Sequence, residues 1–100
     1  MDVQALRSRL KYDPISGVLT WRDGPAAGRE AGTISSDGYR VIFISGKRVK
    51  AHRAAWAIHH GTQPKHQIDH INRVRSDNRI QNLRDVTNAE NQRNRGDRQK

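Results

Sequence analysis

An aspartate beside a histidine, followed by two asparagines, forms the part of this sequence whose residue types could carry out chemistry. Asp69 and His70 open a stretch rich in arginine and asparagine, and Asn82 and Asn91 follow within it. Carboxylate and carboxamide oxygens are hard donors that suit Mg²⁺ or a similar cation. A histidine that titrates near neutrality can take a proton from water. Because the surrounding stretch is cationic, we expect a phosphate polymer as substrate and phosphodiester cleavage as the reaction.

The charge of the whole chain points to the same class of substrate. The formal net charge is +9, from 19 Lys and Arg against 10 Asp and Glu. Such an excess attracts polyanions, and binding that neutralises phosphates should weaken steeply with salt. No stretch pairs a long apolar face with a basic one, so no role at a membrane is expected. The absence of cysteine excludes a disulfide framework, a thiolate zinc site and a cysteine nucleophile.

The first two thirds of the chain are interpreted as scaffold within one small α+β domain of 100 residues. Asp2 is a candidate N-cap for a first helix, and Gly61 is a candidate C′ residue for a second. Trp21 and Trp56 are expected in the core. The elements predicted here are a helix over 2–11, strands over 18–21, 32–34 and 39–44, a strand over 48–51 that completes a hairpin, and a short helix from 52 onward.

The remaining third holds the chemical residues. Isolated aliphatic residues over 68–86 predict two short strands joined by a polar loop over 72–78. Residues 87–90 form a capping box, which predicts a helix that begins at about Asn88 and carries Asn91. Successive side chains of a strand point to opposite faces. Asp69 and His70 can therefore approach one cleft only if the strand ends or bulges at His70.

This stretch resembles a known family. The sequence IDHINRVRSDNRIQNLRDVTNAENQRN is similar to the ββα-metal motif of HNH endonucleases, particularly the homing-type enzymes of bacteriophages, in which asparagine replaces the closing histidine of the motif. The upstream block DGYRVIFISGKRVKAHRAAW is similar to the segment that precedes the motif in such phage proteins. Together the matches cover residues 12 to 95.

The resemblance implies a role for each motif position. His70 would be the general base that activates water, and Asn82 would brace the loop and orient that histidine. Asp69 and Asn91 would be ligands of one divalent cation that also contacts the scissile phosphate. An asparagine ligand favours Mg²⁺ or Mn²⁺ over Zn²⁺. Glu90 is a harder ligand on the same helix, but it already has the capping role.

Six arginines around the motif are candidates for contacts with DNA phosphates: Arg73, Arg75, Arg79, Arg84, Arg93 and Arg95. Other polar residues have structural interpretations. Asn72, Asp77 and Asn78 are expected to form the loop, and His52 to be structural, with a bond toward the site as the alternative. His59, His60 and His66 have no spacing of a standard zinc site.

We therefore expect a metal-dependent DNA endonuclease that nicks DNA or cuts both strands, as a monomer, a homodimer or with a partner protein. Residues 1–66 would be the scaffold, 67–95 the ββα-metal motif and 96–100 a loose tail of a single HNH domain. The sequence shows no signal peptide and no membrane-spanning run, so we expect a cytoplasmic protein, in the host cytoplasm if a phage encodes it. The alternatives are a non-catalytic DNA- or RNA-binding module with the same fold and an accessory protein that binds RNA.

Overall fold

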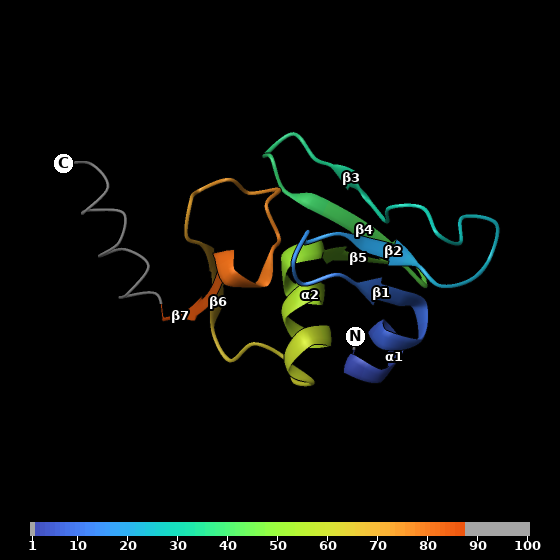
Figure 1. Ribbon diagram of the computed structural model, residues 1–100, viewed down its shortest axis with the longest axis horizontal. Helices are drawn as coiled ribbons and strands as arrows, with labels where there is room; N and C mark the ends of the chain where they lie inside the picture. Colours follow the sequence, from blue (N-terminus) through green and yellow to red (C-terminus); the bar gives the residue numbers. More distant parts are fainter. Residues whose placement is uncertain (1, 88–100) are drawn as a thin grey trace.

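Short antiparallel strands and two helices make up residues 2–87, the part of the chain that the computed structural model describes (Figure 1). The mixture of strands and helices confirms the predicted α+β class. In chain order the elements are α1 (Val3–Arg9), β1 (Leu10–Tyr12), β2 (Leu19–Trp21), β3 (Thr33–Ile34), β4 (Arg40–Ile44), β5 (Lys47–Lys50), α2 (Ala51–His60), β6 (Gln67–His70), a 3₁₀ turn (Ile80–Asn82) and β7 (Leu83–Val86).

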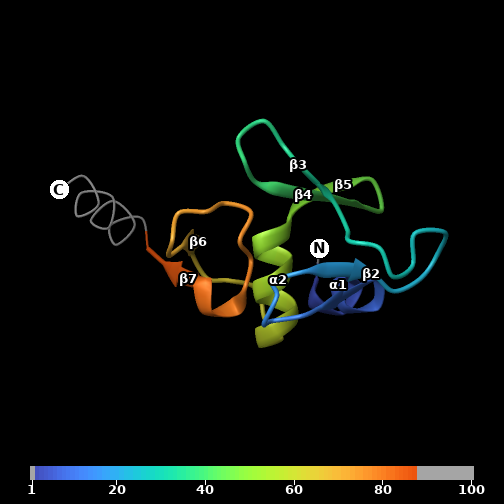
Figure 2. The same ribbon diagram turned by 45° about the horizontal axis from the view of Figure 1, so that its top comes forward.

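The strands form three separate antiparallel sheets, β1–β2, β3–β4–β5 and β6–β7. Each sheet is built from neighbours in the sequence, so every strand pairing is closed by a local turn or loop. Helix α2 lies between the β6–β7 pair and the other two sheets in both ribbon views (Figures 1 and 2). The helix therefore connects the scaffold to the segment that carries the predicted chemistry.

The first helix is shorter than its sequence pattern predicts. The Oδ1 atom of Asp2 accepts a hydrogen bond of 2.8 Å from the backbone N–H of Ala5, which confirms the predicted N-cap. The helix ends at Arg9, however, and Leu10 begins β1, where it pairs with Trp21. A short apolar spacing fits a helix or a strand, and here pairing with β2 supplies the backbone partners. The predicted helix over 2–11 is thus wrong over its last residues.

The central hairpin runs directly into the second helix. β4 and β5 pair from Val41 with Lys50 to Ile44 with Lys47, as the sequence predicts, and α2 begins at the next residue, Ala51. Gly61 ends α2 in the left-handed conformation with φ of 76°, which confirms its predicted role.

Helix α2 is the centre of the core. Its alanines at 51, 54, 55 and 57 are buried and let the neighbouring elements approach closely. They share a core cluster with Leu6, Leu10, Leu19, Ala31, Ile42, Ile44 and Leu83. Trp21 and Trp56 are partly buried and pack against that cluster. No helix within residues 2–87 is long and apolar enough to span a membrane.

The two strands predicted over 68–86 are present as β6 and β7. They pair in register from Gln67 with Val86 to His70 with Leu83, and residues 71–82 connect them. Leu83 reaches the core cluster, and Ile68 packs against it, so one face of this sheet is turned toward α2. The predicted helix from Asn88 onward, with its capping box, lies outside the described residues.

Candidate active site

Asp69 and His70 occupy the last two positions of β6, and their side chains leave the strand on opposite faces. Regular pairing continues through both, with Asp69 opposite Arg84 and His70 opposite Leu83. His70 shares the buried face with Ile68, two residues earlier, as the alternation of a strand requires. The strand ends immediately after His70, where the chain turns. Only one of the pair therefore faces α2, and the two side chains can approach one cleft only at the end of the strand, where pairing stops after His70.

The imidazole of His70 is buried and held by a carboxamide. His70 is 5% exposed, and its Nε2 atom lies 2.9 Å from Oδ1 of Asn78, which is itself 3% exposed. With the carboxamide oxygen of Asn78 as the acceptor, this bond assigns the hydrogen to Nε2 and the lone pair of the neutral ring to Nδ1. An imidazole fixed in this way presents Nδ1 as its basic atom.

Two rings from the scaffold form the wall beside His70. The ring of His52, on the first turn of α2, lies 4.9 Å from that of His70 in an edge-on arrangement. The ring of Tyr39, next to the start of β4, lies 6.0 Å from the His70 ring. Burial, followed by the nearby charges of His70, Lys50 and Arg53, lowers the pKa of His52 to about 3. His52 is therefore a neutral, packed ring at neutral pH, in agreement with its structural interpretation.

The carboxylate of Asp69 is paired across the sheet. Its Oδ2 atom accepts a bond of 2.8 Å from Nη2 of Arg84, and the Asp69 side chain is 10% exposed against 43% for Arg84. The pair follows directly from the register, because Asp69 and Arg84 face one another on β6 and β7. Arg84 engages only Oδ2, and a carboxylate oxygen is a hard donor.

Asn82 braces the connecting loop through its side-chain carboxamide. Its Oδ1 atom accepts from the N–H of Asn72 at 2.9 Å, and its Nδ2 atom donates to Oδ1 of Asn72 and to the carbonyl of Asp77. Asn82 is 4% exposed, so these bonds replace water contacts that burial removes. The bond to His70 comes from Asn78, and Asn82 acts on the loop that contains Asn78.

The arginines of the loop also make contacts within the protein. Arg79 donates from Nε and Nη2 to the two carboxylate oxygens of Asp77, each at 2.8 Å. This bidentate bond lowers the pKa of Asp77 to about 2, together with a weaker bond from Asn72. Arg75 donates to the carbonyl of Asp37 at 2.6 Å, and its guanidinium lies 5.0 Å from the centre of the Tyr39 ring. The loop is thus fastened to the β3–β4 turn.

The described residues hold part of the predicted metal site. Within residues 2–87 no three His, Cys, Asp or Glu side chains gather in a group that could hold a metal ion. Asp69 is the predicted ligand that falls within them. Asn91, Arg93 and Arg95 lie outside the described residues, so their predicted roles stay predictions.

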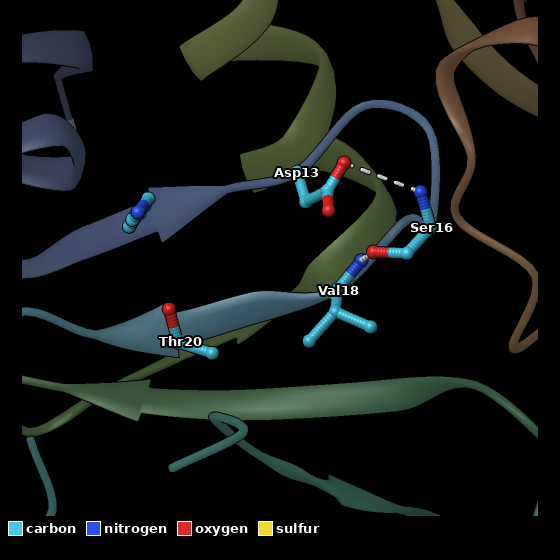
Figure 3. Close-up of a pocket in the computed structure, with 5 residues that line it drawn as sticks. Asp13, Ser16, Val18 and Thr20 are labelled. Atoms are coloured by element: carbon cyan, nitrogen blue, oxygen red, sulfur yellow. Dashed lines mark hydrogen bonds between the residues drawn. The ribbon is translucent and has the colours of Figure 1, made fainter. Parts of the chain in front are cut away.

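A separate pocket lies on the scaffold. It has a volume of about 360 Å³ and is lined by residues of the β1–β2 hairpin, namely Lys11, Asp13, Ser16, Val18 and Thr20 (Figure 3). Asp13 is engaged within its own turn, because its Oδ1 accepts from the N–H groups of Ile15 and Ser16. The pocket contains none of the predicted site residues and lacks a histidine or a second carboxylate.

Two contacts at the site have no clear signal in the sequence. Asn78 is interpreted there only as a loop former, although its side chain bonds His70. Tyr12 belongs to the scaffold, yet its hydroxyl donates to the backbone carbonyl of Asn78. The two residues are 66 positions apart, and no local pattern links them.

Comparisons with known proteins bear on both the segment and the fold. Residues 49–93 match the model of a family described as HNH endonuclease. The chain is also similar to the structure of the HNH homing endonuclease I-HmuI, which was described for DNA binding and cleavage. That similarity has a TM-score of 0.64 at 28% sequence identity and covers 96% of this chain and 58% of the other. No curated protein matches the sequence.

The chain thus spans little more than half the length of the homing endonuclease that it resembles. The family match begins at Val49 and includes α2 as well as the β6–β7 pair. The match confirms the resemblance seen in the sequence: residues 49–93 are similar to HNH endonucleases, and the fold is similar to that of an HNH homing endonuclease.

Proposed function

We propose that this protein is a metal-dependent endonuclease that hydrolyses phosphodiester bonds of DNA. The observation that carries the proposal is the placement of His70. A buried imidazole, held by a side-chain hydrogen bond, ends a strand directly after a carboxylate, within a segment that matches HNH endonucleases. Cationic side chains are sufficient for DNA binding alone, whereas a histidine held in one orientation directly after a carboxylate also fits general-base catalysis.

His70 is proposed as the general base. With its hydrogen on Nε2 and bonded to Asn78, the ring offers Nδ1 to a water molecule that attacks phosphorus. The Asn78 bond supports the cation that forms when Nδ1 takes the proton, because the carboxamide oxygen points at the ring N–H. Proton removal of this kind contributes typically about 100- to 10,000-fold to a rate.

Asp69 is proposed as one ligand of a divalent cation, with Asn91 as the second. The chemistry of Asp69 fits a hard ion, because its carboxylate is anionic and only Oδ2 is engaged by Arg84 among the described contacts. A bound Mg²⁺ or Mn²⁺ would stabilise negative charge on the phosphate and on the leaving oxygen. Arg84 has a role of its own in this arrangement, since it fixes the carboxylate across the sheet.

The arginines are proposed to contact the DNA backbone although several of them already make bonds inside the protein. A guanidinium has five N–H donors. The bonds to protein atoms engage two of them in Arg79, one in Arg84 and one in Arg75. Their remaining donors can bind phosphate oxygens while the internal bonds keep each side chain in place, which limits the entropy lost on binding.

A plasmid assay tests the catalytic proposal. Supercoiled plasmid is incubated with the protein and Mg²⁺, and nicked and linear products are measured over time. We expect cleavage that EDTA abolishes and that His70→Ala reduces by about 100-fold or more. His59→Ala is the matched control. His59 is exposed on α2, so this variant should cleave at the rate of the parent protein.

Two results would contradict the mechanism. Cleavage that persists in EDTA would exclude the divalent cation, and cleavage by His70→Ala within a few-fold of the parent rate would exclude the base. A third result, binding of DNA without cleavage in any divalent metal, would favour the non-catalytic binding module. Circular dichroism of each variant shows whether a lost activity reflects a lost fold.

The order in which nicked and linear products appear addresses the stoichiometry. A monomer should accumulate nicked circles before linear DNA, because each encounter cuts one strand. A homodimer with two sites should give linear DNA early, and sedimentation of the protein with a DNA duplex then measures the number of copies bound.

The salt dependence of DNA affinity tests the arginine contacts. Four candidate arginines lie within residues 2–87, namely Arg73, Arg75, Arg79 and Arg84. One phosphate contact from each predicts a loss of about 100-fold in DNA affinity between 50 and 200 mM salt. Arg84→Gln should lower the slope of log affinity against log salt by about 1, as expected for one lost contact. Arg29→Gln, an exposed position in the loop after β2, should leave the slope unchanged. Equal slopes for the two variants would show that Arg84 makes no contact with the DNA phosphates.

A further inference from the structure

The orientation of His70 depends on a loop residue whose own position is fixed from the other end of the chain. Asn78 bonds His70 through its side chain and accepts the hydroxyl of Tyr12 at its backbone carbonyl. Tyr12 is the last residue of β1, in the scaffold, whereas the family match begins at residue 49. A bonded path thus leads from the scaffold to the ring proposed as the base.

The turn after Tyr12 packs on the same point of the loop. The carbonyl of Pro14 accepts from the N–H of Ile80 at 3.1 Å. Gly17, with φ of +80°, lies so close that a Cβ atom there would be 2.4 Å from the N atom of Arg79 and 2.6 Å from the carbonyl carbon of Asn78. We call residues 12–17 the N-terminal clamp. It holds the backbone on either side of Asn78.

The other brace of the loop acts elsewhere. The side chain of Asn82 bonds Asn72 and Asp77, so it fixes the loop at these two residues. The clamp bonds and packs against residues 78–80. The two braces share no hydrogen bond, and the carbonyl of Asn78 is held by the clamp.

We infer that Tyr12 is a positioning residue for His70: by holding the Asn78 carbonyl, it fixes the carboxamide that keeps the hydrogen of His70 on Nε2 and leaves Nδ1 facing the reaction. The hydroxyl of Tyr12 is a dependable donor, because burial first and the nearby carboxylates of Asp13 and Asp77 second raise its pKa well above the ordinary value. The effect on cleavage rests on the proposed function, whereas the effect on the histidine hydrogen does not.

The tautomer of His70 can be measured directly in the full 100-residue chain. Long-range proton–nitrogen NMR of ¹⁵N-histidine protein at pH 8 distinguishes a ring with hydrogen on Nε2 from one with hydrogen on Nδ1. The His70 signals are assigned as those that vanish in His70→Ala. We expect the Nε2–H form in the parent protein and a mixture of both forms in Tyr12→Phe, which removes the hydroxyl alone.

Tyr39→Phe is the matched control. Tyr39 also lies beside the His70 ring, at 6.0 Å, but no bond of its hydroxyl to Asn78 is present among the described residues. Its variant should keep the Nε2–H form. Asn78→Ala removes the acceptor itself and should give the larger change. If that variant fails to fold, Tyr12→Phe still decides the matter, because it changes a single oxygen atom.

Cleavage kinetics give the second readout. Tyr12→Phe should lower kcat by about fivefold, the effect of one ordinary hydrogen bond, with KM for DNA unchanged. An Nδ1–H tautomer in the parent protein, or an unchanged tautomer in Tyr12→Phe, would overturn the inference whatever happens to the rate. A tautomer that responds as expected in a protein that cuts no DNA would uphold the positioning role and refute the proposed nuclease.

Discussion

Acidification should lower the free energy of unfolding through His52, and the size of this decrease follows from the burial of the His52 ring. His52 is 6% exposed, and its pKa is lowered from 6.5 to about 3, by burial first and by nearby charges second. In the unfolded chain the ring takes up a proton as the pH falls through 6.5, while the folded protein excludes that proton until about pH 3. The unfolded state therefore binds more protons in this window, and stability falls as the pH falls.

The expected loss between pH 7.5 and pH 5.0 is about 2 kcal/mol. At pH 5.0 the folded ring is still neutral, so the loss is set by protonation of the unfolded chain, at about 1.4 kcal/mol for each pH unit below 6.5. Urea denaturation followed by the fluorescence of Trp21 and Trp56 measures it. With a slope of about 1–2 kcal/mol per molar for a chain of this size, the midpoint should fall by about 1–2 M.

The variant His52→Gln isolates this contribution. Glutamine does not titrate, whereas the carboxylates and other histidines titrate in both proteins and cancel in the difference. The parent protein should therefore lose about 2 kcal/mol more than His52→Gln over the same pH interval. His59→Gln, at an exposed position of the same helix, should behave like the parent protein. An equal loss in the parent protein and His52→Gln would refute the reasoning, since it would mean that the buried ring takes up its proton without unfolding.

The remaining predictions concern packing. Gly17→Ala should cost at least about 2 kcal/mol, because its φ is +80° and a Cβ atom would meet the backbone of Arg79 at 2.4 Å. Gly46 has a φ of +79° but open space around it, so Gly46→Ala should lower the free energy of unfolding by only about 1–2 kcal/mol. Equal decreases for the two glycine variants in urea denaturation would contradict the close packing of the N-terminal clamp. Leu10→Ala should lower the free energy of unfolding by about 2–5 kcal/mol, because Leu10 is fully buried. Ile15→Ala, at a residue that is 85% exposed, should change it by no more than about 0.5 kcal/mol. A similar melting temperature for the two variants would show that Leu10 is not a core residue.

Local physics explains which elements could be predicted. The β4–β5 hairpin, the helix that follows it and its end at Gly61 depend on a run of β-branched and aromatic residues, a turn at Ser45 and Gly46, and a glycine with positive φ. Each of these signals acts within a few residues. The end of the first helix could not be found in this way, because Leu10 satisfies helical spacing as well as strand pairing. Only the presence of β2 as a partner decides between the two.

The sequence by itself determined which type of chemistry to propose. The charge of +9, the Asp69–His70 pair and the asparagines around it favour a phosphate polymer as substrate and offer a candidate base and hard oxygen donors. Their residue types need no fold to be recognised. Strand alternation also predicts that Asp69 and His70 diverge unless the strand ends or bulges at His70, and the regular pairing of β6 with β7 keeps the two side chains on opposite faces of the strand.

The tertiary structure decided which residues hold the pair in place. Asp69 meets Arg84 through strand register, and His70 meets Asn78 across a loop and His52 across the boundary with the scaffold. The hydroxyl of Tyr12 reaches Asn78 over a separation of 66 residues. Such contacts leave no periodic pattern, because they depend on how separately formed elements pack, so the hydrogen on His70 became assignable only when Asn78 was seen beside it.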